Sequence, residues 1–214
     1  MVKLDIMSDP ICPWCYIGKT NLDRALAQRP DHPFLITWHP FQLNPDMPKD
    51  GMDRRAYLEA KFGGKDGAVR AYAPVVEHAE KAGLKINLEA IEKTPNTLDA
   101  HRLIHWAGIE GMQNAVVDAL FNAYFVEGRD IGDTDVLADI ADSSGMDASV
   151  VLRLLSTDED RAEIVERDAA ARGMGVTSVP TFVVASQHAV PGAQPTELWL
   201  RVLDDLAQGA TLDA

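Results

Sequence analysis

The chain has 214 residues, of which 46% are hydrophobic and 25% are charged. This length allows one large domain or two small ones, and the composition is that of a folded globular protein. With 20 basic and 33 acidic side chains the net charge is −13, which disfavours binding to nucleic acid or to an anionic membrane surface. Two cysteines are too few for a disulfide scaffold, so packing must stabilise the fold.

The beginning of the chain shows no targeting pattern. Asp5 and Asp9 interrupt its apolar run, and no stretch of the chain approaches the roughly 20 apolar residues that a membrane-spanning helix needs. If Met1 is the true start, we expect a cytoplasmic protein.

The first elements alternate between strand and helix. Apolar alternation predicts a strand over residues 2–7, followed by a turn at Ser8-Asp9-Pro10. A helical pattern covers residues 13–26, and a second strand-like run covers residues 34–41. This order predicts a βαβ unit with a parallel strand pair.

A predominantly helical part follows a proline-rich loop over residues 42–51. Strand signals return at residues 181–184 and 189–190, before a last helix over residues 195–207. We therefore expect an α/β protein with one mixed sheet, built from both ends of the chain and flanked by helices, and a large all-helical insertion. The predicted helices of the insertion cover residues 53–62, 65–82, 97–108, 113–127, 134–143 and 159–172.

Both cysteines lie in the run Cys12-Pro13-Trp14-Cys15, between the first strand and its helix. A C-x-x-C pair in a βαβ unit is typical of a redox site, because the helix N-terminus stabilises a thiolate. Pro13 suits the first helical position. We expect Cys12 to be the more exposed nucleophile and Cys15 the buried resolving thiol. The alternatives are half of a zinc site, although no second cysteine pair exists, and two inert core thiols.

A second motif is Ser178-Val179-Pro180-Thr181, which leads into a compact apolar strand. A proline at that position gives up a hydrogen-bond donor of the sheet. Taken with the cysteine pair, it predicts a cis Val179–Pro180 bond packed beside the disulfide. A trans proline that only starts the strand is the alternative.

Together these motifs resemble the thioredoxin fold of the DsbA family, and further runs are similar to its cytosolic, FrnE-like members, named as polyketide-biosynthesis dithiol-disulfide isomerases. The resemblance covers essentially the whole chain. It implies a discontinuous thioredoxin-like domain (residues 1–50 and 174–214), a helical insertion domain (residues 51–173), and a thiol–disulfide oxidoreductase or isomerase. The further matching runs are Ser8-Asp9, Ile11 to Gly18, Pro40-Phe41-Gln42-Leu43-Asn44-Pro45, Asn96-Thr97, Ala100-His101-Arg102-Leu103 and Gly192-Ala193-Gln194.

The resemblance leaves three functions open. In a thiol–disulfide enzyme the redox-active disulfide serves without a bound cofactor, and the partners are protein or small-molecule thiols, with glutathione as a candidate co-substrate. Kappa-class glutathione transferases and 2-hydroxychromene-2-carboxylate isomerase look similar but carry serine where Cys12 stands, so a glutathione-dependent isomerase or transferase is the first alternative. A chaperone-like binding module is the second. The resemblance permits dimers.

One departure from the family concerns the residue between the cysteines. DsbA has a histidine there, and this chain has the neutral Trp14. We therefore expect a potential between about −120 mV for DsbA and about −270 mV for thioredoxin.

Candidate groove residues lie elsewhere in the chain. We expect Phe41, Asn44, His101 and Gln194 to line a substrate groove, with His101 as a candidate proton shuttle. His101 and His105 share one helix face, but no further ligand stands at helical spacing beside them, so we expect no metal site. Trp38 is expected in the core. The backbone at Val179 is expected to pair with an extended substrate.

Overall fold

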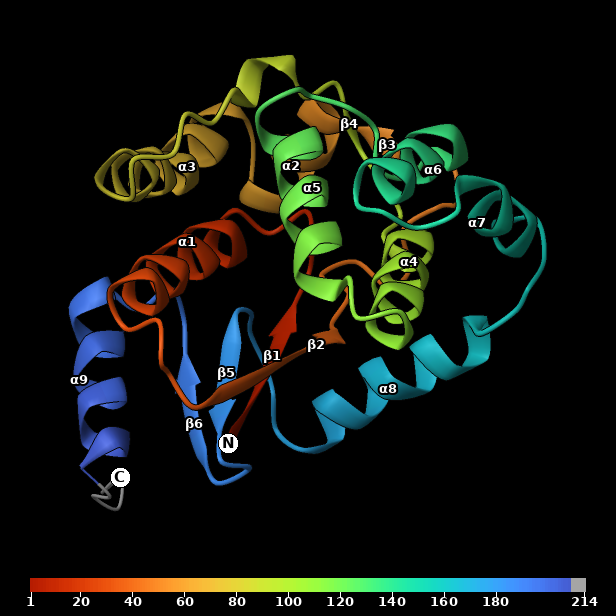
Figure 1. Cartoon of the computed structure of the whole chain (residues 1–214). Coiled ribbons are helices and arrows are strands. Elements are labelled where there is room, and N and C mark those ends of the chain that lie inside the picture. Colours follow the sequence, from red (N-terminus) through yellow and green to blue (C-terminus); the bar gives the residue numbers. More distant parts are fainter. Residues whose placement is uncertain (209–214) are drawn as a thin grey trace.

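The computed structural model describes residues 1–208. Its centre is a four-stranded sheet in the order β2-β1-β5-β6 (Figure 1). β1 pairs with β2 in parallel and with β5 antiparallel, and β5 pairs antiparallel with β6. The predicted mixed sheet from both ends of the chain is thereby confirmed. The strands are β1 (Val2–Ser8), β2 (Phe34–Pro40), β5 (Thr181–Val184) and β6 (His188–Pro191).

Alternation along β1 separates the two faces of the sheet. Leu4 and Ile6 are fully buried in the core, and Ile6 lies opposite Trp38 on one neighbouring strand and Phe182 on the other. Two helices, α1 (Pro13–Gln28) and α9 (Thr196–Ala207), pack side by side over one face (Figure 1). The ring of Phe182 meets that of Trp199 of α9 at 4.8 Å, edge to face.

The remaining helices follow β2. They are α2 (Arg54–Phe62), α3 (Lys65–Lys81), α4 (Leu98–Ile109), α5 (Gln113–Phe125), α6 (Thr134–Ser143), α7 (Ala148–Leu155) and α8 (Arg161–Gly173), with a short 3-10 turn at Leu88–Ala90. α8 lies beside β2, on the side of the sheet away from α1 (Figure 1). None of the helices in residues 1–208 is long and apolar enough to span a membrane.

Two details of this region correct the sequence predictions. The insertion is not all-helical, because β3 (Met52–Asp53) and β4 (Lys93–Thr94) form an antiparallel pair. Two-residue strands show no alternation that a sequence pattern can detect. The second detail is α7, which the predicted helices omit although Asp147 caps it by accepting from the backbone N–H groups of Ser149 and Val150.

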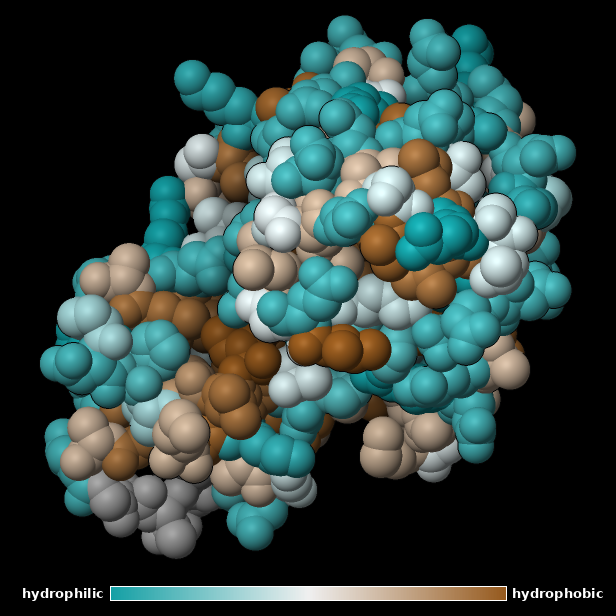
Figure 2. Space-filling model, turned by 45° about the vertical axis from the view of Figure 1, so that its right-hand side comes forward, coloured by the Kyte–Doolittle hydropathy of each residue, from teal (hydrophilic) through white to brown (hydrophobic). Residues whose placement is uncertain are grey.

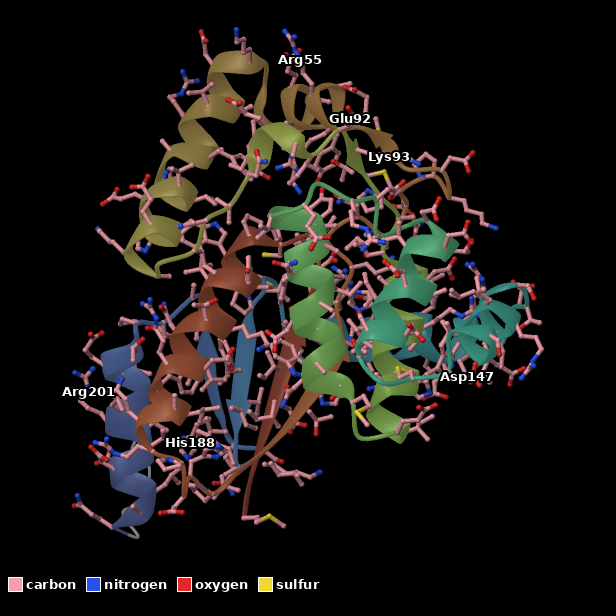
Figure 3. All side chains as sticks on the ribbon, turned by 45° about the horizontal axis from the view of Figure 1, so that its top comes forward. Arg55, Glu92, Lys93, Asp147, His188 and Arg201 are labelled. Atoms are coloured by element: carbon pink, nitrogen blue, oxygen red, sulfur yellow. The ribbon has the colours of Figure 1, made fainter. Side chains whose placement is uncertain are left out.

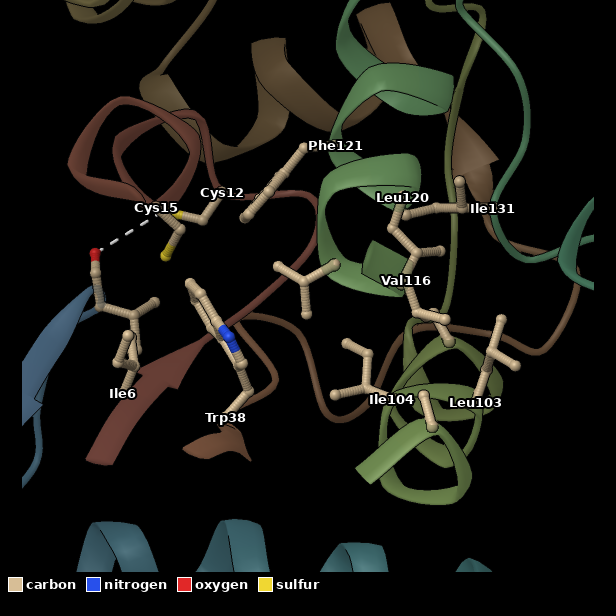
Figure 4. Packing of buried hydrophobic residues seen from close by; sticks show 14 of the residues in the cluster. Ile6, Cys12, Cys15, Trp38, Leu103, Ile104, Val116, Leu120, Phe121 and Ile131 are labelled. Carbon is tan, nitrogen blue, oxygen red and sulfur yellow. Dashed lines mark hydrogen bonds between the residues drawn. The ribbon is translucent and has the colours of Figure 1, made fainter. Parts of the chain in front are cut away.

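One hydrophobic core joins the sheet to the helices. Trp38 of β2, which is 3% exposed as predicted, packs in the same cluster as Leu103, Phe121 and Cys15 (Figure 4). The backbone of Trp38 also bonds Gln113 of α5, whose side chain accepts from its N–H at 2.8 Å and donates to its carbonyl at 3.2 Å. Gln113 thus occupies the open edge of β2, where another strand would otherwise pair. The face of the molecule seen in Figure 2 is largely hydrophilic, with local hydrophobic patches.

Candidate functional site

The two cysteines lie where α1 begins. Cys12 is the N-cap residue in extended conformation, Pro13 is the first helical residue, and Cys15 lies inside the first turn. Both thiols are free. Cys12 is 3% exposed and Cys15 0%, so Cys12 is the more exposed of the two, as expected, although both thiols are buried. The loop at Val179 covers it, and the Cys12 thiol donates to the Val179 carbonyl at 3.6 Å (Figure 4).

Burial dominates the acidity of the Cys15 thiol. It raises the pKa of this thiol well above its usual value, and the neighbouring Cys12 thiol raises this pKa further. The Ser8 hydroxyl and the Asp9 backbone N–H offset only part of this rise. Cys15 is therefore held protonated, while Cys12 lies outside the first turn at the positive end of the helix dipole.

The Val179–Pro180 peptide bond is cis. Pro180 lies so close to α1 that a Cβ added at Gly18 would stand 3.1 Å from its ring. A glycine at position 18 therefore permits this contact between the helix and the proline loop. The Pro180 carbonyl accepts from the backbone N–H of Gly192 at 2.8 Å, which ties the loop to β6.

A cavity of about 300 Å³ opens beside Cys12. Cys12, Trp14 and Val179 form one wall, and side chains of α2 and α3 form the opposite wall. Trp14 is half-buried and meets the His78 ring at 5.2 Å. Most polar residues of this cavity carry no sequence motif and lie at least 39 positions after Cys15, so the sequence gives no signal for them. They are Arg54, Tyr57, Lys61, Tyr72, Thr94 and Tyr124.

None of the four predicted groove residues lines this cavity. Phe41 is 2% exposed under the guanidinium of Arg172, 4.0 Å from its ring centre. Asn44 accepts from the hydroxyl of Tyr57, a residue of the cavity wall, at 2.7 Å. Gln194 donates to the Pro191 carbonyl at 2.7 Å. Each of these three side chains thus bonds or packs within the fold and lies outside the lining of the cavity beside Cys12.

The fourth predicted groove residue, His101, is 3% exposed and lies beside the fully buried Asp9. Its Nε2 is 3.8 Å from Asp9 Oδ1, and Asp9 also accepts from the backbone N–H groups of Leu43 and Ile11. Burial raises the pKa of Asp9 to about 7 and lowers the pKa of His101 to about 4. His101 is therefore neutral near pH 7, which removes the titration on which its proposed shuttle role depends.

One group of candidate metal ligands occurs in residues 1–208, formed by His105, Asp160 and Glu163. The Arg167 guanidinium lies 2.8 Å from His105 Nδ1, and the Trp106 indole donates to Asp160 at 2.7 Å. A guanidinium at that ring nitrogen opposes a second cation, so we assign no metal there.

The similarity to known proteins extends over almost the whole chain. The family model of the DSBA-like thioredoxin domain matches residues 3–204. A probable DsbA oxidoreductase from Streptomyces coelicolor is 30% identical, with a TM-score of 0.87 over 100% of this chain and 93% of that one. A 2-hydroxychromene-2-carboxylate isomerase is 20% identical, with a TM-score of 0.74 over 99% and 100%. The cytosolic disulfide reductase DsbM from Pseudomonas aeruginosa, solved with GSH, is 17% identical, with a TM-score of 0.68 over 96% and 99%.

Proposed function

The chain belongs to the family of DsbA-like thioredoxin domains, which makes it a thiol–disulfide oxidoreductase in the broad sense, and we propose that Cys12 and Cys15 carry the exchange. The observation that carries this proposal is the placement of Cys12 at the N-cap of α1, Cys15 one turn on, and the cis Val179–Pro180 bond against them. In this arrangement Cys12 would react with the substrate, and Cys15 would resolve the mixed disulfide that forms on Cys12.

In the oxidising direction the Cys12–Cys15 disulfide is attacked by a substrate thiolate. The substrate sulfur bonds to Cys12, and Cys15 leaves as a thiolate that takes up a proton. A second substrate thiolate then attacks the substrate sulfur of this mixed disulfide and releases Cys12. The substrate leaves as a disulfide, and its two electrons remain on the reduced enzyme. The reductase direction is the reverse, with Cys12 attacking and Cys15 resolving.

The raised pKa of Cys15 affects the two directions differently. In the oxidising direction it makes Cys15 a poor leaving group, because a good leaving thiol has a low pKa. In the reductase direction it makes the Cys15 thiolate, once formed, a strong nucleophile, which suits Cys15 to resolve the mixed disulfide on Cys12. The Val179 carbonyl, directed at Cys12, is available to pair with an extended substrate in place of the thiol.

Glutathione is the co-substrate that we propose. The solved structure of DsbM with GSH has the same fold, and the cavity beside Cys12 lies at the lower end of small-molecule sites, which hold about 300–1,000 Å³. The proposed place of action is the cytoplasm, where a glutathione pool sets the thiol–disulfide balance.

The test is a redox titration against glutathione, followed by tryptophan fluorescence because Trp14 lies between the cysteines. We expect a reversible two-electron transition, insulin reduction by the reduced protein, trapped mixed disulfides in Cys15→Ser, and no exchange in Cys12→Ser. Exchange that survives Cys12→Ser would contradict the assigned nucleophile.

A glutathione-dependent isomerase is the second candidate, since 2-hydroxychromene-2-carboxylate isomerase shares the fold and the cavity is closer in size to a small molecule than to a protein segment. The same variant separates the two functions. An isomerase that uses the glutathione thiol would retain activity in Cys12→Ser, whereas the proposed oxidoreductase would lose it.

A further inference from the structure

Arg54, the first residue of α2, is a buried cation in the wall of the thiol cavity. It is 6% exposed, and its guanidinium donates to the hydroxyl groups of Tyr124 at 3.0 Å and Tyr72 at 3.3 Å. The next residue, Arg55, points outward and pairs with Glu59 at 2.9 Å (Figure 3). Two adjacent arginines therefore have opposite environments, and only the exposed one has a carboxylate partner.

The charge of Arg54 is not neutralised within the described part of the chain. No carboxylate of residues 1–208 lies within 4.0 Å of its guanidinium. Burial raises the pKa of both Tyr72 and Tyr124, so both phenols stay neutral. They stabilise the cation through their hydroxyl groups and through their rings, whose centres lie 5.4 and 5.8 Å from the guanidinium carbon, but they do not neutralise its charge. Buried charges in proteins are normally paired, because desolvation without a partner is costly.

The cavity wall carries a second cation and no anion. Lys61, on α2 two turns after Arg54, is exposed and bonds the Tyr57 hydroxyl at 2.6 Å, and both residues line the cavity. No aspartate or glutamate is among the residues that line it, in a chain whose net charge is −13. Two cations facing Cys12 therefore form a local positive site in an acidic protein.

We propose that this cavity selects small thiols and disulfides that carry a carboxylate, with Arg54 binding that carboxylate and Lys61 attracting it at the entrance. The inference rests on the proposed exchange at Cys12 and specifies its substrate class. A substrate carboxylate would supply the partner that Arg54 lacks, through charge-assisted hydrogen bonds. The same contact would hold the substrate sulfur in the cavity that Cys12 lines.

The chemical step is a thiol–disulfide exchange. With a small disulfide RSSR, the Cys12 thiolate attacks one sulfur, a Cys12–S–S–R bond forms, and RS⁻ leaves and is protonated. Cys15 then loses its proton and attacks Cys12, so that the second RSH leaves. Two electrons pass from the two thiols to RSSR, and the enzyme ends with a Cys12–Cys15 disulfide.

The experiment compares three disulfides of different charge on the reduced protein. Oxidised glutathione carries carboxylates, hydroxyethyl disulfide is neutral, and cystamine is cationic. Stopped-flow fluorescence gives the second-order rate constant of each, and the readout is the ratio of the glutathione rate to the hydroxyethyl rate. The proteins are the wild type, Arg54→Met, Lys61→Gln and, as a matched control, Lys85→Gln, which removes an exposed charge outside the cavity.

We expect the ratio to fall about tenfold in Arg54→Met and about threefold in Lys61→Gln, and to stay unchanged in Lys85→Gln. The rate of cystamine divided by that of hydroxyethyl disulfide should rise in Arg54→Met and in Lys61→Gln. An unchanged ratio in Lys61→Gln and Arg54→Met would overturn the proposal; if Arg54→Met does not fold, Lys61→Gln decides alone. If the wild type reacts with none of the three disulfides, the proposed exchange itself fails, which is a distinct result.

Discussion

Two buried arginines in this protein have opposite surroundings. Arg102 of α4 is fully buried and saturated: it pairs with Asp99 at 2.9 Å and donates to the carbonyls of Glu159, Leu154 and Thr157. Arg54, in the cavity wall, has two phenols and no carboxylate within residues 1–208. A saturated buried cation joins segments of the fold, whereas an unsaturated one beside a reactive thiol has donors available for a ligand.

The largest expected effect is on stability, at Arg102. Arg102→Met removes a fully buried cation and leaves three partly buried carbonyls without their donor, which should lower the free energy of unfolding by about 3 kcal/mol. Urea unfolding followed by circular dichroism measures this loss. Arg153→Met, which removes an exposed arginine on α7, is the control and should change little. If the free energy of unfolding fell by the same small amount in both variants, Arg102 would have no special role in stabilising the fold.

The next largest effect is expected on the pH dependence of stability, and it comes from the buried pair Asp9 and His101. In the folded state burial raises the pKa of Asp9 from 3.8 to about 7, so its contribution to stability is present at low pH and is lost as the pH rises towards 7. Burial lowers the pKa of His101 from 6.5 to about 4, so its contribution is present above 6.5 and is lost as the pH falls towards 4. Asp168 raises both values and Arg167 lowers that of His101, as smaller influences.

Between pH 4 and 6.5 these two contributions have opposite signs and largely cancel. Single variants should therefore reveal them. In His101→Gln the free energy of unfolding should fall as the pH rises over this window, and in Asp9→Asn it should rise, each by roughly 3 kcal/mol. Urea unfolding at several pH values, with the double variant as the reference, measures both slopes. Slopes of equal sign in the two variants would contradict the assignment.

A smaller stability effect is expected at Arg54. Arg54→Met leaves two neutral phenols without a donor, at a cavity wall that water reaches, so the free energy of unfolding should fall by about 1 kcal/mol. The measurement is the one used for Arg102→Met, and comparison of the two losses tests the contrast directly. A loss at Arg54 as large as that at Arg102 would mean that Arg54, too, serves mainly to hold the fold.

These contrasts also explain what the sequence could and could not predict. The sequence singles out Cys12, Cys15 and Pro180 because each carries a local signal, a spacing of three or a proline before an apolar strand, and the βαβ pattern predicted the parallel pair of β1 and β2. The cavity cations have no such signal. Arg54 and Arg55 are identical neighbours, and only tertiary packing directs one inward. His101 was misplaced for the same reason, since a polar residue on a helix does not show whether it faces a groove or a buried partner.

The last expected effect is on the redox potential rather than on stability, and it separates two ways in which a cation can act near Cys12. Trp14→His places a titratable group between the cysteines, at the helix N-terminus. Its protonated form stabilises the Cys12 thiolate, and hence the reduced protein, so the midpoint against glutathione should become more oxidising by about 30 mV. The wild-type midpoint should lie between about −270 and −120 mV.

The shift should shrink as the pH rises above about 6.5, because the introduced imidazole then loses its charge. Trp14→Phe, which stays neutral, is the control and should leave the midpoint in place. If Arg54 acts on the substrate carboxylate, Arg54→Met should change the rate ratio between anionic and neutral disulfides more than it changes the midpoint, and Trp14→His should do the reverse. A variant of Arg54 that moved the midpoint as far as Trp14→His, with the rate ratio intact, would place its charge on the thiolate rather than on the substrate.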